Sequence, residues 1–326
     1  MAALIDRAAL DSATPHGVLG EDGRSGATLE RLTLTDGRPV VVKHYDPGSD
    51  LVMQMIGDDH GREVELFLTG ALDDLPPTVR HPILNAWYDE RGNGVVVMRD
   101  LGDAVVDWDR VLSVAQVRAI LVGLADLHAA HRDRTEPTQT ALDTVVGLFG
   151  PDRIRRFAGN GLVDAALRGW DHFADVAPGE VGERVLALAH DGTPLVRAMQ
   201  TRSQTLLHGD VATVNLALEP DGLTLFDWGV ATVGPAEVDV ARLLVGCAHI
   251  FDMSFEEFLA LQRDVAGDAH DEASLELALL GGLTWLGWNK ALDIVEHPDE
   301  DVRARERAGL DWWLAQAGHA FERGLV

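Results

Sequence analysis

The chain has little cysteine and few basic residues, and each shortage excludes a class of protein. One cysteine among 326 residues rules out an intrachain disulfide and is typical of a reducing compartment. Lys and Arg number 27 against 53 Asp and Glu, which gives a formal net charge of −26. Affinity for nucleic acid depends on basic side chains that neutralise phosphates, so we expect no nucleic-acid partner. An acidic surface is compatible with a cationic small molecule, and a source proteome that is acidic throughout explains the charge equally well.

The chain also lacks a long apolar run. No stretch reaches the roughly 20 uncharged residues that span a bilayer. The N-terminal sequence MAALIDR meets a charge too early for a signal peptide. We therefore expect a cytoplasmic protein without a membrane partner, either a monomer or a homodimer. Cys247 lies in the apolar run LLVGCA, which favours a buried, unreactive thiol.

What is present points to an ordinary globular protein with a large core. Hydrophobic residues make up 46% of the chain and charged residues 25%. At 326 residues the chain is long enough to form two lobes rather than one.

The most informative stretch is LHGDVATVN at 207–215, followed by LFDWG at 225–229. Between them, two short apolar runs flank a Pro-Asp-Gly turn, a pattern that predicts a β-hairpin. The two ends of a hairpin lie side by side, so we expect Asn215 and Asp227 to be neighbours. Carboxylate and amide oxygens are suitable Mg²⁺ ligands, and Asp210 supplies a further carboxylate for an acceptor hydroxyl. These residue types at this spacing indicate phosphoryl transfer from ATP.

The pattern HGD-x4-N, followed twelve residues on by DWG, resembles the aminoglycoside phosphotransferase family of small-molecule kinases. That resemblance implies an α+β, protein-kinase-like fold with a small β-rich N-lobe and a larger, mainly helical C-lobe. We expect the N-lobe over 1–101, and the C-lobe with the catalytic loop and acceptor site over 102–326. The resemblance implies that Asp210 is catalytic, that Asn215 and Asp227 hold Mg²⁺, and that ATP, or alternatively GTP, donates the phosphate.

Three neighbouring positions qualify this pattern. Ala212 stands two residues after Asp210, where relatives often carry a basic or aromatic residue, so charge compensation for the γ-phosphate is missing there. His208 is interpreted as a residue that fixes the loop. Asp239 is open to two interpretations: an acid that suits the first turn of a helix, or, by resemblance, a support behind the catalytic loop.

The run PVVVKHY at 39–45 predicts a strand that ends near Lys43. By resemblance, Lys43 contacts the α- and β-phosphates; the alternative is a lysine that protects a sheet edge. Its carboxylate partner should lie on a following helix, capped by Asp58 or Asp59, whose apolar stripe is Val64, Leu68, Ala71 and Leu75. Periodicity allows Glu63 or Glu65, and the resemblance favours Glu63.

Two further segments are candidates for nucleotide binding. The glycine-bearing segment Gly20–Gly26, with Ser25, can approach phosphates, although Glu21 and Asp22 would repel them. A plain hairpin turn explains it equally well. The run VVVMRDLG at 95–102 predicts a buried strand leading into a linker, and by resemblance this linker faces adenine. Met98, Asp100 and Leu101 are the candidates there, with Met98 limiting the depth of the base pocket.

Beyond residue 103 the pattern is helical. Ser113 and Gln116 match a capping box, and His128 lies on the apolar stripe that follows, which favours a packing role. In the tryptophan-rich C-terminal region, Trp288, Asn289 and Asp311 are candidates for acceptor binding. Helix packing is the alternative explanation for most of the tryptophans.

Together these features predict Mg²⁺-dependent transfer of the γ-phosphate of ATP to a hydroxyl of a small polar, cationic acceptor. An aminoglycoside or amino sugar is the leading class. Amino alcohols, amino acids, sugars and macrolides are alternatives that the same groups could phosphorylate. The rivals are a nucleotide-binding regulator without catalysis and a metal-dependent phosphohydrolase, which would usually need more ligands.

Overall fold

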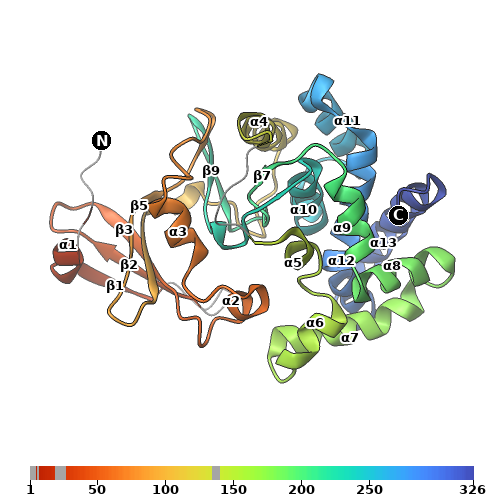
Figure 1. Cartoon of the computed structure of the whole chain (residues 1–326), viewed down its shortest axis with the longest axis horizontal. Coiled ribbons are helices and arrows are strands. Elements are labelled where there is room, and N and C mark those ends of the chain that lie inside the picture. The colour runs from red at the N-terminus through yellow and green to blue at the C-terminus, as the bar shows by residue number, and fades with distance from the viewer. Residues whose placement is uncertain (1–4, 6, 19–26, 134–139) are drawn as a thin grey trace.

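An N-terminal antiparallel sheet and a mainly helical C-terminal region lie at opposite ends of the long axis of the molecule (Figure 1). This computed structural model describes residue 5 and residues 7–18, 27–133 and 140–326. Ser25 and the rest of the glycine-bearing segment lie outside the described residues. The architecture is a protein-kinase-like fold, as the sequence predicted.

The N-terminal sheet has five strands in the order β1-β2-β3-β6-β5. Its strands are β1 (Thr14–Val18), β2 (Thr28–Thr33), β3 (Pro39–His44), β5 (Ile83–Tyr88) and β6 (Gly94–Arg99). The helices of this lobe are α1 (Arg7–Asp11), α2 (Leu51–Ile56) and α3 (Arg62–Leu68).

Side chains along β3 alternate between a small hydrophobic cluster on one face of the sheet and the cleft on the other face. Val40 and Val42 are buried in a small cluster on one face of the sheet. Val41 and Lys43 therefore point to the opposite face. Lys43 pairs with Val96 across to β6, and Val41 pairs with Met98. The period of two thus places the lysine and Met98 on the same side of the sheet.

Helix α3 is shorter than its apolar stripe predicted. It ends at Leu68, which is 54% exposed, and Gly70 follows with a φ of 76°. The prediction that the stripe continues through Ala71 and Leu75 was therefore wrong, because the left-handed backbone at Gly70 ends the helix. Its start agrees with the sequence: Asp58 accepts hydrogen bonds from the backbone N–H groups of Gly61 and Arg62.

The C-terminal region is built around one long buried helix, α12. Its helices are α4 (Val114–Ala130), α5 (Leu142–Val146), α6 (Pro151–Ile154), α7 (Gly161–Val176), α8 (Glu180–His190), α9 (Thr193–Gln200), α10 (Glu237–Cys247), α11 (Phe255–Ala266), α12 (Glu272–Glu296) and α13 (Glu300–Glu322). Short 3₁₀ turns cover Gly102–Ala104, Arg155–Phe157, Trp228–Val230, Ala248–Ile250 and Gly267–Ala269. Both hydrogen bonds of the capping box predicted at Ser113 and Gln116 are present at the start of α4.

Short strands in this region carry the loops of the cleft. They are β7 (Thr205–Leu207), β8 (Leu216–Glu219), β9 (Gly222–Leu225) and β10 (Thr232–Gly234). Strand β4 (Val79–Arg80), from the N-terminal part of the chain, pairs with β9. Strands β8 and β9 form the predicted hairpin, with Leu216 opposite Leu225. Within the described part of the chain, none of the helices combines the length and apolar character needed to cross a bilayer.

Candidate active site

The loop after β7 is held from behind by a buried carboxylate. Asp239, on α10, accepts hydrogen bonds from the backbone N–H groups of His208 (3.0 Å) and Gly209 (2.9 Å). Asp239 is fully buried, and Nε2 of His128 lies 2.9 Å from Oδ2, the oxygen that also accepts the N–H of His208. Asp239 therefore supports the loop from behind, while also lying in the first turn of α10. His128 is a buried, hydrogen-bonded histidine, as predicted.

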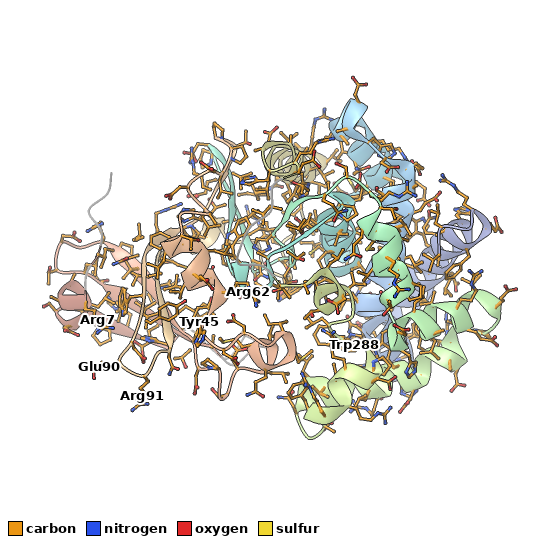
Figure 2. The ribbon with its side chains drawn as sticks, in the orientation of Figure 1. Arg7, Tyr45, Arg62, Glu90, Arg91 and Trp288 are labelled. Carbon is orange, nitrogen blue, oxygen red and sulfur yellow. The ribbon has the colours of Figure 1, made fainter. Side chains whose placement is uncertain are left out.

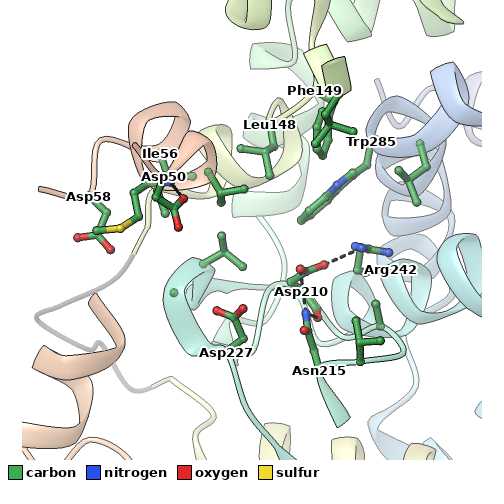
Figure 3. Close-up of a pocket in the computed structure, with 18 of the residues that line it drawn as sticks. Asp50, Ile56, Asp58, Leu148, Phe149, Asp210, Asn215, Asp227, Arg242 and Trp285 are labelled. Carbon is green, nitrogen blue, oxygen red and sulfur yellow. Dashed lines mark hydrogen bonds and ion pairs between the residues drawn. The ribbon is translucent and has the colours of Figure 1, made fainter. Parts of the chain in front are cut away.

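Asn215 and Asp227 flank the paired ends of the β8–β9 hairpin. The backbone N–H of Phe226 donates to the carbonyl of Asn215 at 3.1 Å. The side-chain amide of Asn215 donates to the carbonyl and to the carboxylate of Asp210, both at 3.0 Å (Figure 3). The structure therefore brings Asp210, Asn215 and Asp227 together, with the amide of Asn215 orienting Asp210.

Lys43 reaches this hairpin from the other lobe. Its Nζ lies 2.8 Å from Oδ1 of Asp227 and 3.8 Å from Oε2 of Glu63. Burial lowers the pKa of Lys43, but Asp227 and Glu63 outweigh burial and leave that pKa above its ordinary value. Burial likewise raises the pKa of Asp227, and Lys43 more than compensates, so this carboxylate is ionised. The two groups form a charged pair across the cleft.

Glu63, and not Glu65, faces Lys43. Glu63 is fully buried, whereas Glu65, two residues further along α3, is exposed. The Glu63 carboxylate accepts hydrogen bonds from the hydroxyl of Tyr45 and from the backbone N–H groups of Asp227 and Trp228. The sequence did not single out Tyr45, although its position two residues after Lys43 places it on the same face of the strand.

Arg62 extends this contact between the lobes. Its guanidinium donates to the carbonyl of Gly229 at 3.0 Å and to the hydroxyl of Thr140 at 2.6 Å. Figure 2 shows Tyr45 and Arg62 on the N-terminal lobe and Trp288 across from them in the helical region. Two neighbouring residues of α3 thus hold the Asp-Trp-Gly turn: Glu63 accepts its backbone N–H groups, and Arg62 donates to the carbonyl of Gly229.

The residues at the hairpin ends fit a magnesium ion. The amide nitrogen of Asn215 is engaged with Asp210, which leaves the amide oxygen as the group available to a cation. The Asp227 side chain is 42% exposed to the cleft, and Lys43 contacts only one of its oxygens. One carboxylate oxygen and one amide oxygen, completed by phosphate oxygens, are a suitable set for Mg²⁺.

Arg242 is a residue at this site that the sequence did not reveal. From α10, its Nη2 lies 2.6 Å from Oδ1 of Asp210, and its guanidinium lies 5.1 Å from the ring centre of Trp285. The side chain is 11% exposed. Arg242 follows Asp239 by three residues on the same helix, so both face the loop. Only the fold shows that this face meets Asp210.

Two cavities meet at these residues. The first, about 330 Å³, lies under the N-terminal sheet, and Lys43, Met98, Asp100 and Leu101 line it. The second, about 210 Å³, extends between α2 and α12 and is lined by Asp210, Arg242 and Trp288. Both share four residues: Lys43, Val214, Asn215 and Asp227. Of the predicted nucleotide residues in the described chain, Lys43, Met98, Asp100 and Leu101 line the first cavity, whereas Glu63 does not line it and contacts Lys43 instead.

The structure does not bring all the predicted acceptor residues to the second cavity. Of the three candidates, Trp288 lines it, while Asn289 and Asp311 do not. Asn289 is one helical step, about 100°, from Trp288, and its amide donates to Asp293 on the same helix. Asp311 is exposed on α13. The interpretation of these two polar residues as acceptor ligands is thus not supported by their positions.

Together, the two-lobed fold and this cleft define a protein-kinase-like phosphotransferase. The chain belongs to the phosphotransferase enzyme family APH, whose family model matches residues 21–277. The resemblance inferred from the two motifs is thereby confirmed. No protein of curated function is significantly similar to the chain in sequence.

Several solved structures share the fold at low sequence identity. Choline kinase LicA from Streptococcus pneumoniae matches with a TM-score of 0.54 and 13% identity, over 93% of this chain and 94% of that chain. A structure of LicA in complex with AMP matches with a TM-score of 0.52. Aminoglycoside phosphotransferase APH(3'')-Id from Streptomyces rimosus, in complex with ADP and streptomycin, matches with a TM-score of 0.50 and 18% identity, over 81% of this chain and 95% of that chain.

Proposed function

We propose that this protein transfers the γ-phosphate of ATP to a hydroxyl of a small molecule, in a Mg²⁺-dependent reaction. The observation that carries the proposal is the junction of the two cavities. Lys43, Asn215 and Asp227 line both, whereas Asp210 lines only the second. A nucleotide in the first cavity would direct its terminal phosphate toward a hydroxyl beside Asp210.

The first cavity suits a purine nucleotide. Apolar side chains of Leu29, Val41, Val105 and Phe226 line it, and Lys43 stands at its inner end. A flat base fits between such side chains, and the lysine is placed for the non-transferred phosphates. Relatives of the same fold bind AMP and ADP. ATP is the proposed donor, with GTP as the alternative, and a cytoplasmic location would supply either.

Asp210 has the position of the group that orients the acceptor hydroxyl. In a loose transition state the proton leaves late, so the carboxylate mainly positions the hydroxyl and accepts the proton at the end. Asn215 and Asp227 would hold the magnesium ion, which when bound neutralises charge on the phosphates. Glu63 contacts both Lys43 and the backbone of the Asp-Trp-Gly turn, and would fix their relative positions.

The acceptor is proposed to be a small polar hydroxyl compound. The sequence favours an aminoglycoside or amino sugar, and this stays a prediction. Relatives with the same fold include a choline kinase and an aminoglycoside phosphotransferase, so the fold alone leaves the acceptor open.

The test is Asp210→Asn. We expect kcat to fall by roughly 10²–10⁴-fold while the dissociation constant for ATP stays within about twofold, since Asp210 acts on the acceptor and not on the nucleotide. The rate of ADP release is measured with a panel of acceptors and with water as the acceptor, and it gives kcat. Calorimetry gives the dissociation constant for the nucleotide. The exposed acid Asp264 provides the control, Asp264→Asn.

Two results would contradict this assignment. An equal loss of nucleotide binding in Asp210→Asn would show that the residue has another role. Nucleotide binding by the native protein without ADP release on any acceptor or with water would favour the catalytically inactive regulator.

A further inference from the structure

The second cavity has one wall without charge. Leu148, Phe149, Leu162, Trp285, Leu286 and Trp288 line it on the side of the helical region. Figure 3 shows Leu148, Phe149 and Trp285 across the cavity from Asp50, Ile56 and Asp58 of the other lobe. Trp285 and Trp288 are each 3% exposed, so their rings are fixed by packing. A ligand in this cavity therefore meets an apolar, largely aromatic surface on one side.

Most of the negative charge in this cavity is already compensated. Four carboxylates line it, and Asp210 and Asp227 are paired with Arg242 and Lys43. Asp58 accepts three backbone N–H groups, from His60, Gly61 and Arg62.

Asp50 is the remaining carboxylate. It accepts the backbone N–H of Met53 through one oxygen. Burial raises its pKa, and the hydrogen bond from Met53 and the charge of Lys43 offset that effect only in part. The cavity thus offers one carboxylate, opposite the apolar wall, that an ammonium group could pair with.

Apart from Oδ1 of Asp210, which is ion-paired with Arg242, the polar atoms without a hydrogen-bond partner on the residues that line this cavity can donate. Among the described residues they are Nε and Nη1 of Arg242, Nε1 of Trp288 and the hydroxyl of Thr213, and each is buried. A buried donor without a partner costs free energy that a ligand oxygen can recover. The cavity is therefore matched to a ligand that presents hydroxyl, carbonyl or carboxylate oxygens beside the apolar wall.

We infer that the acceptor is an amphiphilic hydroxyl compound with an apolar ring or chain, oxygen acceptors near Arg242 and Trp288, and no more than one ammonium group. This inference depends on the proposed phosphotransferase function and narrows it. A polycation would bring several ammonium groups against Arg242, Lys43 and the aromatic wall, where their lost hydration is not replaced. An amino sugar joined to an apolar group would match the apolar wall, the Asp50 carboxylate and the donors of Arg242 and Trp288.

Three ligands provide the test: glucosamine, its phenyl glycoside, which adds an apolar ring, and the larger polycation kanamycin, which adds ammonium groups. Affinities are measured on the full chain with ADP and Mg²⁺ present, by calorimetry or by quenching of tryptophan fluorescence. We expect the phenyl glycoside to bind at least about 10-fold more tightly than either of the others. If kanamycin binds as tightly as the phenyl glycoside, or if the phenyl group adds nothing to glucosamine, the inference is overturned.

A pair of matched tryptophan variants tests the indole N–H of Trp288, a residue that lines the cavity. Trp288→Phe removes the indole N–H and keeps an aromatic ring. We expect the KM for the acceptor to rise roughly 10-fold while the KM for ATP is unchanged. Trp313→Phe is the control, because Trp313 is also buried and its Nε1 also lacks a partner among the described residues, but it does not line this cavity. Equal effects of the two variants would contradict the assignment.

A negative charge placed in the apolar wall should shift the binding preference from the phenyl glycoside toward kanamycin. Leu162 is half-buried, so Leu162→Asp is tolerable in the fold. We expect this variant to bind the phenyl glycoside more weakly and kanamycin more tightly than the native protein does. An unchanged ratio of the two affinities would contradict the inference. Because nucleotide binding and ADP release with water are measured without any acceptor, failure of the proposed function is distinguishable from failure of this inference.

Discussion

At the scale of single residues, Arg242 brings Asp210 a positive charge that the loop around Asp210 does not supply. Ala212, two positions after Asp210, is apolar and 2% exposed, so no basic side chain comes from the loop at that point. The guanidinium of Arg242 arrives instead from α10 and contacts Asp210 at 2.6 Å. A contact of this length fixes the carboxylate in one orientation.

Arg242→Gln should therefore lower kcat by roughly 10–100-fold, with little change in the KM for ATP, because Asp210 loses the group that orients it. Arg242→Lys should recover part of the lost kcat, because lysine keeps the positive charge but lacks the planar guanidinium with its several N–H donors. Steady-state kinetics with both substrates varied provide the measurement. Arg118→Gln, in an exposed pair with Asp264, is the control and should be unchanged. A rise in the KM for ATP alone would contradict this role.

Gly209 is the position of the loop that tolerates no side chain. Its φ is 83°, and an added Cβ would lie 2.4 Å from the carbonyl oxygen of Val230. The backbone there is both left-handed and closely packed against the turn that follows Asp227.

We expect Gly209→Ala to reduce the free energy of unfolding by about 2–4 kcal/mol. We also expect a strong fall in kcat, because the added Cβ must move away from the carbonyl of Val230 and would displace the adjoining Asp210. Chemical denaturation and ADP-release assays measure the two effects. Gly161→Ala is the matched control, since an added Cβ at Gly161 would meet nothing within 4 Å. Native-like stability of Gly209→Ala would refute the close contact.

At the scale of elements, helix α3 couples the two lobes through adjacent residues. Glu63 accepts the N–H groups of Asp227 and Trp228, and Arg62 donates to the carbonyl of Gly229. The turn that carries Asp227 is thus held by a helix of the opposite lobe. Asp227 itself has a φ of 64°, a conformation that costs free energy for a residue other than glycine and that these contacts stabilise.

Glu63→Gln should raise the KM for ATP roughly 10-fold and reduce stability by about 1–3 kcal/mol, because a neutral amide replaces the charged acceptor of a buried network. Burial and the charge of Glu63 raise the pKa of Tyr45 well above its ordinary value, so the tyrosine stays a donor in this network. Glu65→Gln, exposed on the same helix, should behave like the native protein. The reverse result would make Glu65 the partner of Lys43.

At the scale of the whole molecule, an ion pair joins the end of the N-terminal sheet to the β8–β9 hairpin. Arg99 donates two hydrogen bonds to Glu219, at 2.7 and 2.8 Å. The guanidinium of Arg99 lowers the pKa of Glu219 from 4.5 to about 2. Because the folded pKa lies below the unfolded value, the pair stabilises the fold fully above the unfolded pKa. That contribution is lost as the pH falls toward 2.

Arg99→Gln should therefore reduce the free energy of unfolding by about 1–2 kcal/mol at neutral pH, an amount that allows for solvent screening of the half-exposed arginine. The difference from the native protein should shrink between about pH 5 and pH 2–3. Urea unfolding at a series of pH values measures it, with Arg118→Gln as a surface-pair control. A difference that stays constant with pH would exclude the proposed linkage.

The amino-acid sequence by itself determined the hairpin and its ends, the strand lysine, the family and the fold class. The hairpin is a local feature, since a Pro-Asp-Gly turn between two apolar runs made Asn215 and Asp227 neighbours. Lys43, the family and the fold class followed from the resemblance that short motifs carry. The capping box at Ser113 is local in the same way. Such patterns are visible in the sequence because the interacting residues lie within a few positions of one another.

The tertiary structure alone decided which cation reaches Asp210 and what lines the second cavity. For the partner of Lys43, periodicity left Glu63 and Glu65 open, and only the resemblance favoured Glu63. Glu63 and Glu65 flank one apolar stripe, and Arg242 and Asn289 lie on helices whose sequences do not show which surface each residue meets. The contact between Glu63 and Asp227 spans 164 residues, and neither residue carries a mark of the other. Contacts of that kind arise from the packing of the lobes, and packing depends on the whole chain at once.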